Sequence, residues 1–184
     1  MENSQTSYTA FDGHRLLTTG TPVDVALAVK AAIEREVAGP VLTFDDATGR
    51  VVDLDLRGSD TEIAARFAEP SRGRGRPKLG VVAREITLLP RHWDWLATRT
   101  GGASVTLRRL IDEARRTDGG QGRIKAARET AYRFMSAMAG DLPGFEEATR
   151  ALFAGDEVRL KQHTAAWPED LRAYARKLLE GSVG

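Results

Sequence analysis

Cysteine is absent from the 184 residues of this sequence, which excludes disulfide bonds, thiol nucleophiles and cysteine-ligated zinc or iron–sulfur sites. Long apolar runs are missing too, because no stretch approaches the roughly 18 consecutive apolar residues of a membrane span. The first residues lack the basic start and apolar run of a secretory signal peptide. We therefore expect a cytoplasmic protein without a membrane partner. Its hydrophobic fraction of 41% suffices for a buried core in one ordinary domain or in two to three small modules.

The net charge of +1 conceals an uneven distribution of charge along the chain. Residues 1–69 contain 6 basic and 12 acidic residues, a net charge of −6. Residues 70–133 contain 15 basic and 6 acidic residues, a net charge of +9, and residues 134–184 contain 6 and 8, a net charge of −2. Such asymmetry is typical of a chain whose basic part binds nucleic acid or another acidic surface.

The first 69 residues predict a small α+β domain with the element order ββαββα. Asp12-Gly13 separates two short segments of strand-forming residues and predicts a hairpin. A helix is expected to begin after Thr21, with Pro22 in its first turn, and to end before Gly39.

The second half of this domain predicts another hairpin and a short helix. Its strands are expected at Val41–Phe44 and Val51–Leu56, and the second of these alternates apolar with acidic residues. Ser59 and Glu62 have the spacing of a capping box and predict the start of the helix.

The remaining chain predicts a basic linker, a strand followed by two helices, and a helical C-terminal domain. The linker contains almost only Gly, Pro, Ser, Arg and Lys and cannot form a core. A strand is expected at Val81–Leu89, one helix begins at Pro90, and a second helix is capped by Ser104 after a Gly-Gly break. The expected boundaries are 1–69 for the α+β domain, 70–80 for the linker, 81–117 for the strand and helix pair, and 123–184 for the helical domain.

Within the linker, Arg72–Lys78 resembles an AT-hook, whose core sequence is Arg-Gly-Arg-Pro. The narrow minor groove of A·T-rich DNA has a deep negative potential that attracts inserted arginines, and the exocyclic amine of a G·C pair would obstruct them. Glycine allows close approach of the backbone, and proline keeps it extended. The candidate DNA-binding residues here are Arg72, Arg74, Gly75, Arg76, Pro77 and Lys78. The alternative is a solvated basic linker without a specific partner.

The segment Val81–Arg116 resembles the ribbon–helix–helix fold, in which a strand is followed by two helices. The resemblance implies an obligate homodimer, because a single strand is stable only when it pairs with the same strand of a second chain. It also implies that the paired strands enter the major groove of DNA. In the second helix, the apolar residues expected to face the core are Leu107, Leu110, Ile111 and Ala114.

The direction of the side chains in this strand determines which residues could contact DNA bases. If Ile86 and Leu88 face the core, Glu85 and Thr87 face the DNA; the other register exposes both apolar residues. The free amides at the start of the second helix would bind phosphate. The additional candidate DNA-binding residues are Arg84, Thr87, Ser104 and Arg108. The alternative is an ordinary strand of the N-terminal sheet followed by a helix pair.

Candidate catalytic and metal-binding residues are few and scattered. The three histidines have no metal-ligand spacing, and we expect each at the surface: His14, His92 and His163. Four acidic residues could in principle hold a hard cation, although alternating acids more often form the solvent face of a strand: Asp45, Asp46, Asp53 and Asp55. We therefore expect no catalytic residue, no metal and no cofactor.

Several stretches together resemble a bacterial family of unknown function. They include YTAFDGHRLLTTG, PVLTFDDATGRVVDLDLRGS and AYRFMSAMAGDLPGFEEATRALFAGD. This resemblance implies a bacterial origin and no particular activity.

These observations predict a homodimeric bacterial DNA-binding protein of the nucleoid, either a transcriptional regulator or a nucleoid-associated factor. It would bind the A·T-rich minor groove through two linked hooks, which raises the effective affinity without new contacts. No small-molecule ligand is predicted. One alternative is a protein–protein interaction or oligomerisation module without nucleic acid. A second is a small enzyme or ligand-binding protein that uses the N-terminal α+β domain.

Overall fold

The computed structural model describes residues 6–36, 39–68, 84–118 and 120–180. The chain divides into two compact units. The large unit comprises Met1–Glu69 and Arg123–Gly184, and the small unit comprises Pro70–Gly122. No helix within the described ranges is long and apolar enough to cross a membrane.

The large unit contains a three-stranded antiparallel sheet in the order β2-β1-β3. Its strands are β1 (Tyr8–Asp12), β2 (Arg15–Gly20) and β3 (Val41–Asp45). The predicted hairpin at Asp12-Gly13 is confirmed, and Gly13 has a φ of 53°, which glycine adopts without strain. The sheet therefore brings the first strand to its centre.

Side chains of β1 alternate between two apolar layers, as the period of a strand requires. Ala10 packs with Val25 and Val29 of α1 (Pro22–Glu34) on one face. Phe11 packs with Phe134 on the other face. The central strand thus carries core residues on both sides.

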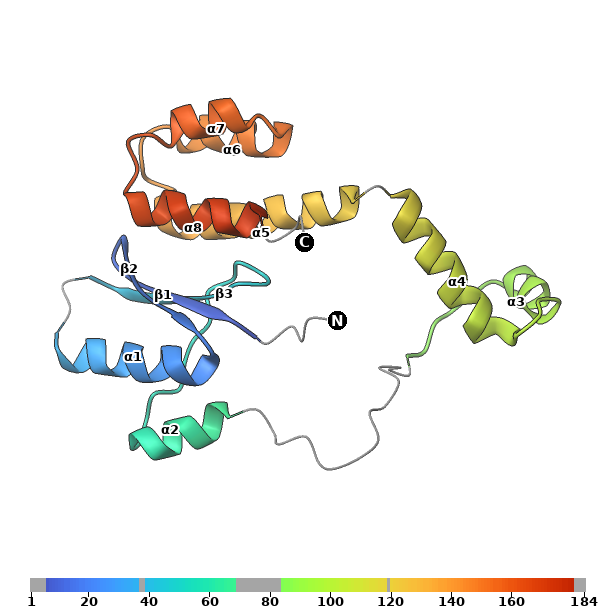
Figure 1. Cartoon of the computed structure of the whole chain (residues 1–184), viewed down its shortest axis with the longest axis horizontal. Helices are drawn as coiled ribbons and strands as arrows, with labels where there is room; N and C mark the ends of the chain where they lie inside the picture. Colours follow the sequence, from blue (N-terminus) through green and yellow to red (C-terminus); the bar gives the residue numbers. More distant parts are fainter. Residues whose placement is uncertain (1–5, 37–38, 69–83, 119, 181–184) are drawn as a thin grey trace. The chain divides into compact units, whose positions relative to one another are not determined.

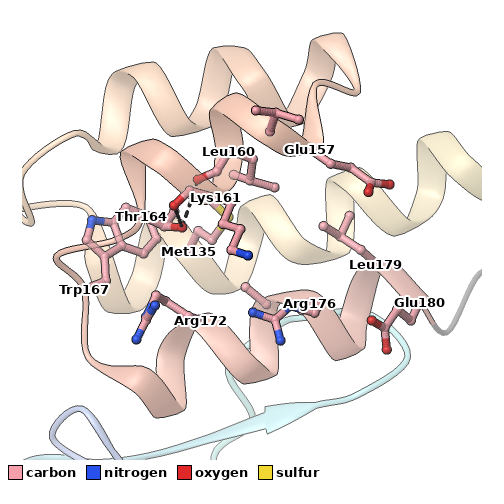
Figure 2. Close-up of a pocket in the computed structure, with 12 residues that line it drawn as sticks. Met135, Glu157, Leu160, Lys161, Thr164, Trp167, Arg172, Arg176, Leu179 and Glu180 are labelled. Atoms are coloured by element: carbon pink, nitrogen blue, oxygen red, sulfur yellow. Dashed lines mark hydrogen bonds between the residues drawn. The ribbon is translucent and has the colours of Figure 1, made fainter.

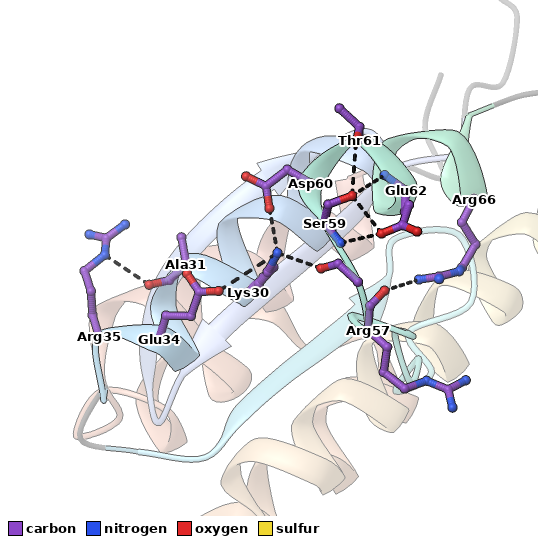
Figure 3. Close-up of polar contacts among 11 residues, drawn as sticks. Lys30, Ala31, Glu34, Arg35, Arg57, Ser59, Asp60, Thr61, Glu62 and Arg66 are labelled. Carbon is purple, nitrogen blue, oxygen red and sulfur yellow. Dashed lines mark hydrogen bonds and ion pairs between the residues drawn. The ribbon is translucent and has the colours of Figure 1, made fainter.

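The caps predicted for the first two helices are confirmed. The Asp24 amide at the start of α1 donates to the Thr21 hydroxyl, and Ser59 with Glu62 forms the capping box of α2 (Asp60–Phe67). Figure 3 shows how Lys30 of α1 joins the two helices: its ammonium donates to the Asp60 carboxylate at 2.7 Å and to the Gly58 carbonyl at 2.9 Å. The hydrogen bond to Asp60 raises the pKa of Lys30.

The strand predicted at Val51–Leu56 is wrong beyond its first residue. Val51 forms a single bridge with Phe44, and residues 52–57 belong to no strand. The Arg66 guanidinium donates to the backbone carbonyls of Asp55 and Arg57 at 2.7 and 3.1 Å. These carbonyls are satisfied by a side chain, so the order is ββαβα rather than ββαββα.

The C-terminal segment contributes four helices on the side of the second face of the sheet. Their bounds are α5 (Gln121–Ala139), α6 (Phe145–Ala154), α7 (Glu157–His163) and α8 (Glu169–Glu180). In Figure 1, α5 and α8 lie directly on the sheet, opposite α1, and α6 and α7 lie beyond them. The N-terminal sheet is thus enclosed between helices from both ends of the chain.

Aromatic side chains from both segments form the centre of this unit. The ring centroids of Phe11 and Phe134 lie 5.4 Å apart, those of Phe44 and Phe134 5.0 Å, and those of Phe134 and Tyr174 4.6 Å. Each residue is at least 95% buried. The sequence predicted separate domains at 1–69 and 123–184, whereas these segments share one core.

The small unit contains α3 (Pro90–Ala97) and α4 (Gly102–Thr117). The helix start predicted at Pro90 is confirmed. The cap of α4 is Gly101 rather than the predicted Ser104, because Gly101 and Gly102 have φ values of 91° and 75° that let the chain turn directly into the helix. Within the described part of the predicted strand, residues 84–89 pair with no other strand of the chain.

Candidate functional site

The AT-hook-like residues Arg72, Arg74, Gly75, Arg76, Pro77 and Lys78 lie outside the described residues. Their DNA-binding role therefore stays a prediction from sequence. The other four predicted DNA-binding residues lie in the described part of the small unit.

Those four residues are all exposed. Arg84 and Thr87 precede α3, whereas Ser104 and Arg108 occupy successive turns of α4. The Arg108 Nε donates to the Ser104 backbone carbonyl at 3.1 Å. Among the described residues, no hydrogen bond or ion pair connects Arg84 or Thr87 with this pair, so the structure joins two of the four candidates.

Arginines dominate the solvent side of α4. Four of them are exposed: Arg108, Arg109, Arg115 and Arg116. The last two lie in the final turn of the helix, where cations are stabilised by the helix dipole. The small unit contains 11 basic and 5 acidic residues, a net charge of +6, and the large unit contains 16 and 21, a net charge of −5. The charge asymmetry of the sequence therefore coincides with a structural division.

Large apolar side chains of the small unit are also exposed. Ile111, which the sequence assigned to a core-facing stripe, is 56% exposed, and Leu110 is 38% exposed. Trp93 and Trp95 of α3 are 43% and 42% exposed. Of the described residues in this unit, only Leu96 and Thr106 are buried. The helix pair therefore presents an apolar surface that is not buried within the small unit itself.

One of these tryptophans has a cationic neighbour. The Arg99 guanidinium lies 4.1 Å from the centroid of the Trp95 ring, a cation–π geometry. The exposed surface of the small unit thus combines aromatic, aliphatic and basic groups. This composition is common at macromolecular interfaces.

Most of the histidines and acidic residues that the sequence brought forward lie in the large unit. His14 is exposed and His163 is half-buried. Across the described ranges, no group of three His, Cys, Asp or Glu side chains is placed to hold a metal ion. Asp45 caps a turn by accepting from the amides of Ala47 and Thr48, and Asp55 pairs with Arg57.

Asp46 has a structural role that the sequence did not indicate. Its carboxylate accepts hydrogen bonds from four side chains: Ser7 at 3.0 Å, Thr9 at 2.7 Å, Tyr174 at 2.7 Å and Lys177 at 2.9 Å. Burial raises its pKa, but the hydrogen bonds outweigh burial and hold the pKa of Asp46 below its usual range. Burial and the bond to this carboxylate raise the pKa of Tyr174. Asp46 thus connects α8 to the sheet through hydrogen bonds.

Comparison with known proteins identifies a protein family. A family model described as "uncharacterized protein conserved in bacteria", DUF2239, matches residues 7–179. The comparison with curated proteins found no match, and neither did the comparison with solved structures.

Proposed function

The chain belongs to this uncharacterized bacterial family, DUF2239, and we propose that it binds DNA as a homodimer through its small unit. The observation that carries the proposal is the separation of charge between the units: a net charge of +6 in the small unit against −5 in the large unit. A polyanion is attracted to the first and repelled by the second.

The arginines of α4 are suited to phosphate contacts. All four are exposed, and the first turn of α4 contains no acidic residue that would repel a phosphate. Arg108 and Arg115 are seven residues apart and therefore share one side of the helix. In the proposed complex, they contact the backbone of the duplex and position the protein, while the AT-hook-like segment reads the A·T-rich minor groove.

The uncovered apolar surface supports a second copy of the chain as the partner. Ile86 and Leu89 before α3, both tryptophans of α3 and Ile111 of α4 are all between 42% and 56% exposed. A helix pair with two buried residues has too little core to be stable alone. In a ribbon–helix–helix dimer, each chain completes the core of the other, and the unpaired residues 84–89 gain a strand partner. The dimer would also contain two AT-hook-like segments, one from each chain.

The proposal is tested by fluorescence anisotropy with A·T-rich and G·C-rich duplexes of equal length at several salt concentrations. We expect tighter binding to the A·T-rich duplex. Arg74→Ala combined with Arg76→Ala should abolish this preference and reduce the slope of log K against log salt by about 2. The matched control is Arg150→Ala with Arg159→Ala, two exposed arginines of the large unit, which should leave both quantities unchanged.

An equal affinity for the two duplexes would contradict the proposed role of the AT-hook-like segment. A preference that survives the Arg74 and Arg76 substitutions would contradict it as well. Absence of DNA binding by a chain that still dimerises would favour the alternative, a protein–protein interaction module without nucleic acid.

A further inference from the structure

The large unit contains a pocket of about 490 Å³ between α5, α7 and α8. Figure 2 shows Met135 and Leu160 at its base and Leu179 toward one end. Trp167, which is 3% exposed, lines the other end. The volume and the apolar lining are typical of a site for a small organic ligand.

Three cationic side chains surround this apolar space. Lys161 of α7 and Arg176 of α8 approach it from opposite sides, and Arg172 lies next to Trp167 (Figure 2). Among the residues that the structure describes, the Lys161 ammonium and the Arg176 guanidinium have no hydrogen-bond or ion-pair partner. Both side chains are exposed to solvent, so they are free to bind an anion that enters the pocket.

Arg172, the third cationic residue of the lining, has one side-chain donor without an acceptor. Its Nη2 pairs with Glu169, but its Nε is buried and has no hydrogen-bond partner. A buried donor without an acceptor is costly. That Nε is inaccessible from the pocket, so the groups available to an anion there are those of Lys161 and Arg176, both exposed.

The charge balance selects the class of anion. Two acidic residues, Glu157 and Glu180, also line the pocket and lie at the end away from Arg172 (Figure 2). Glu169, which pairs with Arg172, brings the acidic residues around the pocket to three against three cations. With no surplus of positive charge, a monoanion is accommodated better than a phosphate dianion. Guanidinium groups also bind carboxylates in a bidentate geometry.

We infer that this pocket binds an organic monoanion with an apolar body, such as a medium-chain or aromatic carboxylate. The carboxylate is held by Lys161 and Arg176. The apolar body lies against Leu160, Met135 and Leu179. This site is separate from the small unit and does not depend on the proposed binding of DNA.

Isothermal titration calorimetry of the full-length chain with decanoate tests the inference. We expect one site with a Kd of the order of 100 µM or tighter. Decanol has the same tail without the charge, and we expect it to bind at least about tenfold more weakly because it cannot form charge-assisted hydrogen bonds. Decyl phosphate distinguishes the head groups, and we expect it to bind no more tightly than decanoate.

Lys161→Gln combined with Arg176→Gln should weaken decanoate binding at least about tenfold. Lys125→Gln combined with Arg150→Gln removes the same charge at exposed positions that do not line the pocket, and should leave the affinity unchanged. Circular dichroism of both double variants shows whether they fold as the wild type does.

Failure of decanoate to saturate a site at millimolar concentration would overturn the inference. Equal binding of decanol, or equal loss of affinity in the two double variants, would also overturn it. Tighter binding of decyl phosphate would contradict the assignment to a carboxylate.

Discussion

Removal of the Asp46 carboxylate should weaken the attachment between the two chain segments that form the large unit. Asp46 lies just after β3, and the side chains that donate to it come from both segments: Ser7 and Thr9 from the N-terminal one, Tyr174 and Lys177 from α8. The Asp46 side chain is only 14% exposed, so its loss leaves the hydroxyls of Thr9 and Tyr174 poorly hydrated. The substitution Asp46→Ala therefore removes a contact that bridges a long stretch of sequence.

The expected cost follows from these contacts. A hydrogen bond to a charged group contributes about 1.5–3 kcal/mol, and two of the four involve largely buried hydroxyls. The ion pair with Lys177 adds at most about 1 kcal/mol, because that side chain is half exposed. Asp46→Ala should therefore lower the free energy of unfolding by about 3–5 kcal/mol. Asp46→Asn, which keeps one acceptor oxygen, should cost about half as much.

Urea unfolding followed by circular dichroism measures these changes. A double-mutant cycle of Asp46→Ala with Tyr174→Phe should give a coupling of about 1–2 kcal/mol. The pKa of Asp46 is lowered from 3.8, so its stabilisation is complete above that value and is lost as the pH falls through the lower native pKa. The difference between wild type and Asp46→Asn should narrow accordingly below about pH 4. A cost of less than about 1 kcal/mol, or no coupling with Tyr174, would refute this reasoning.

Three further predictions concern the small unit and the helix caps. Ile111→Asp places a charge in the uncovered apolar surface. Sedimentation at micromolar concentration should show that the variant is a monomer and the wild type a dimer. Identical sedimentation profiles of the two proteins would contradict the proposed dimer interface. Arg108→Ala combined with Arg115→Ala should weaken binding to both A·T-rich and G·C-rich duplexes equally and lower the salt slope by about 2, whereas a change in preference would indicate base contacts. Ser59→Ala breaks the capping box of α2 and should cost about 1 kcal/mol in urea unfolding; no change would mean that Glu62 alone sustains the helix start.

Local signals in the sequence predicted most of the elements correctly. Asp12-Gly13 identified the hairpin, Thr21 and Ser59 identified helix starts, and Pro90 identified the start of α3. Each of these features depends on a few neighbouring residues, whose conformational preferences are readable from the chain itself.

The errors come from contacts between distant residues. The alternating pattern at Val51–Leu56 predicted a strand, but Arg66 takes two of the backbone carbonyls in that region. Phe11 and Tyr174 are far apart in the sequence, yet their ring centroids lie 5.4 Å apart, and no local pattern indicates that pairing. For the same reason, the sequence predicted two domains where there is one core.

The candidate sites show the same contrast: features set by neighbouring residues were predicted, and contacts between distant residues were not. The amphipathic pattern of α4 predicted an apolar face and an arginine face, and both exist, although the apolar face is not buried within the small unit. The pocket joins Lys161 to Arg176 from two helices, and neither residue belongs to a motif. Its only sequence signal is a pair of basic residues on amphipathic helices, which occurs on many solvent-exposed surfaces.

The mass of the protein–DNA complex tests the central proposal most directly. Native mass spectrometry of the full-length chain with an A·T-rich duplex of about two helical turns should show two chains on one duplex, because two hooks on one dimer occupy one site. A complex containing a single chain would contradict the homodimer. Free duplex and free protein at micromolar concentration and low salt would contradict DNA binding itself.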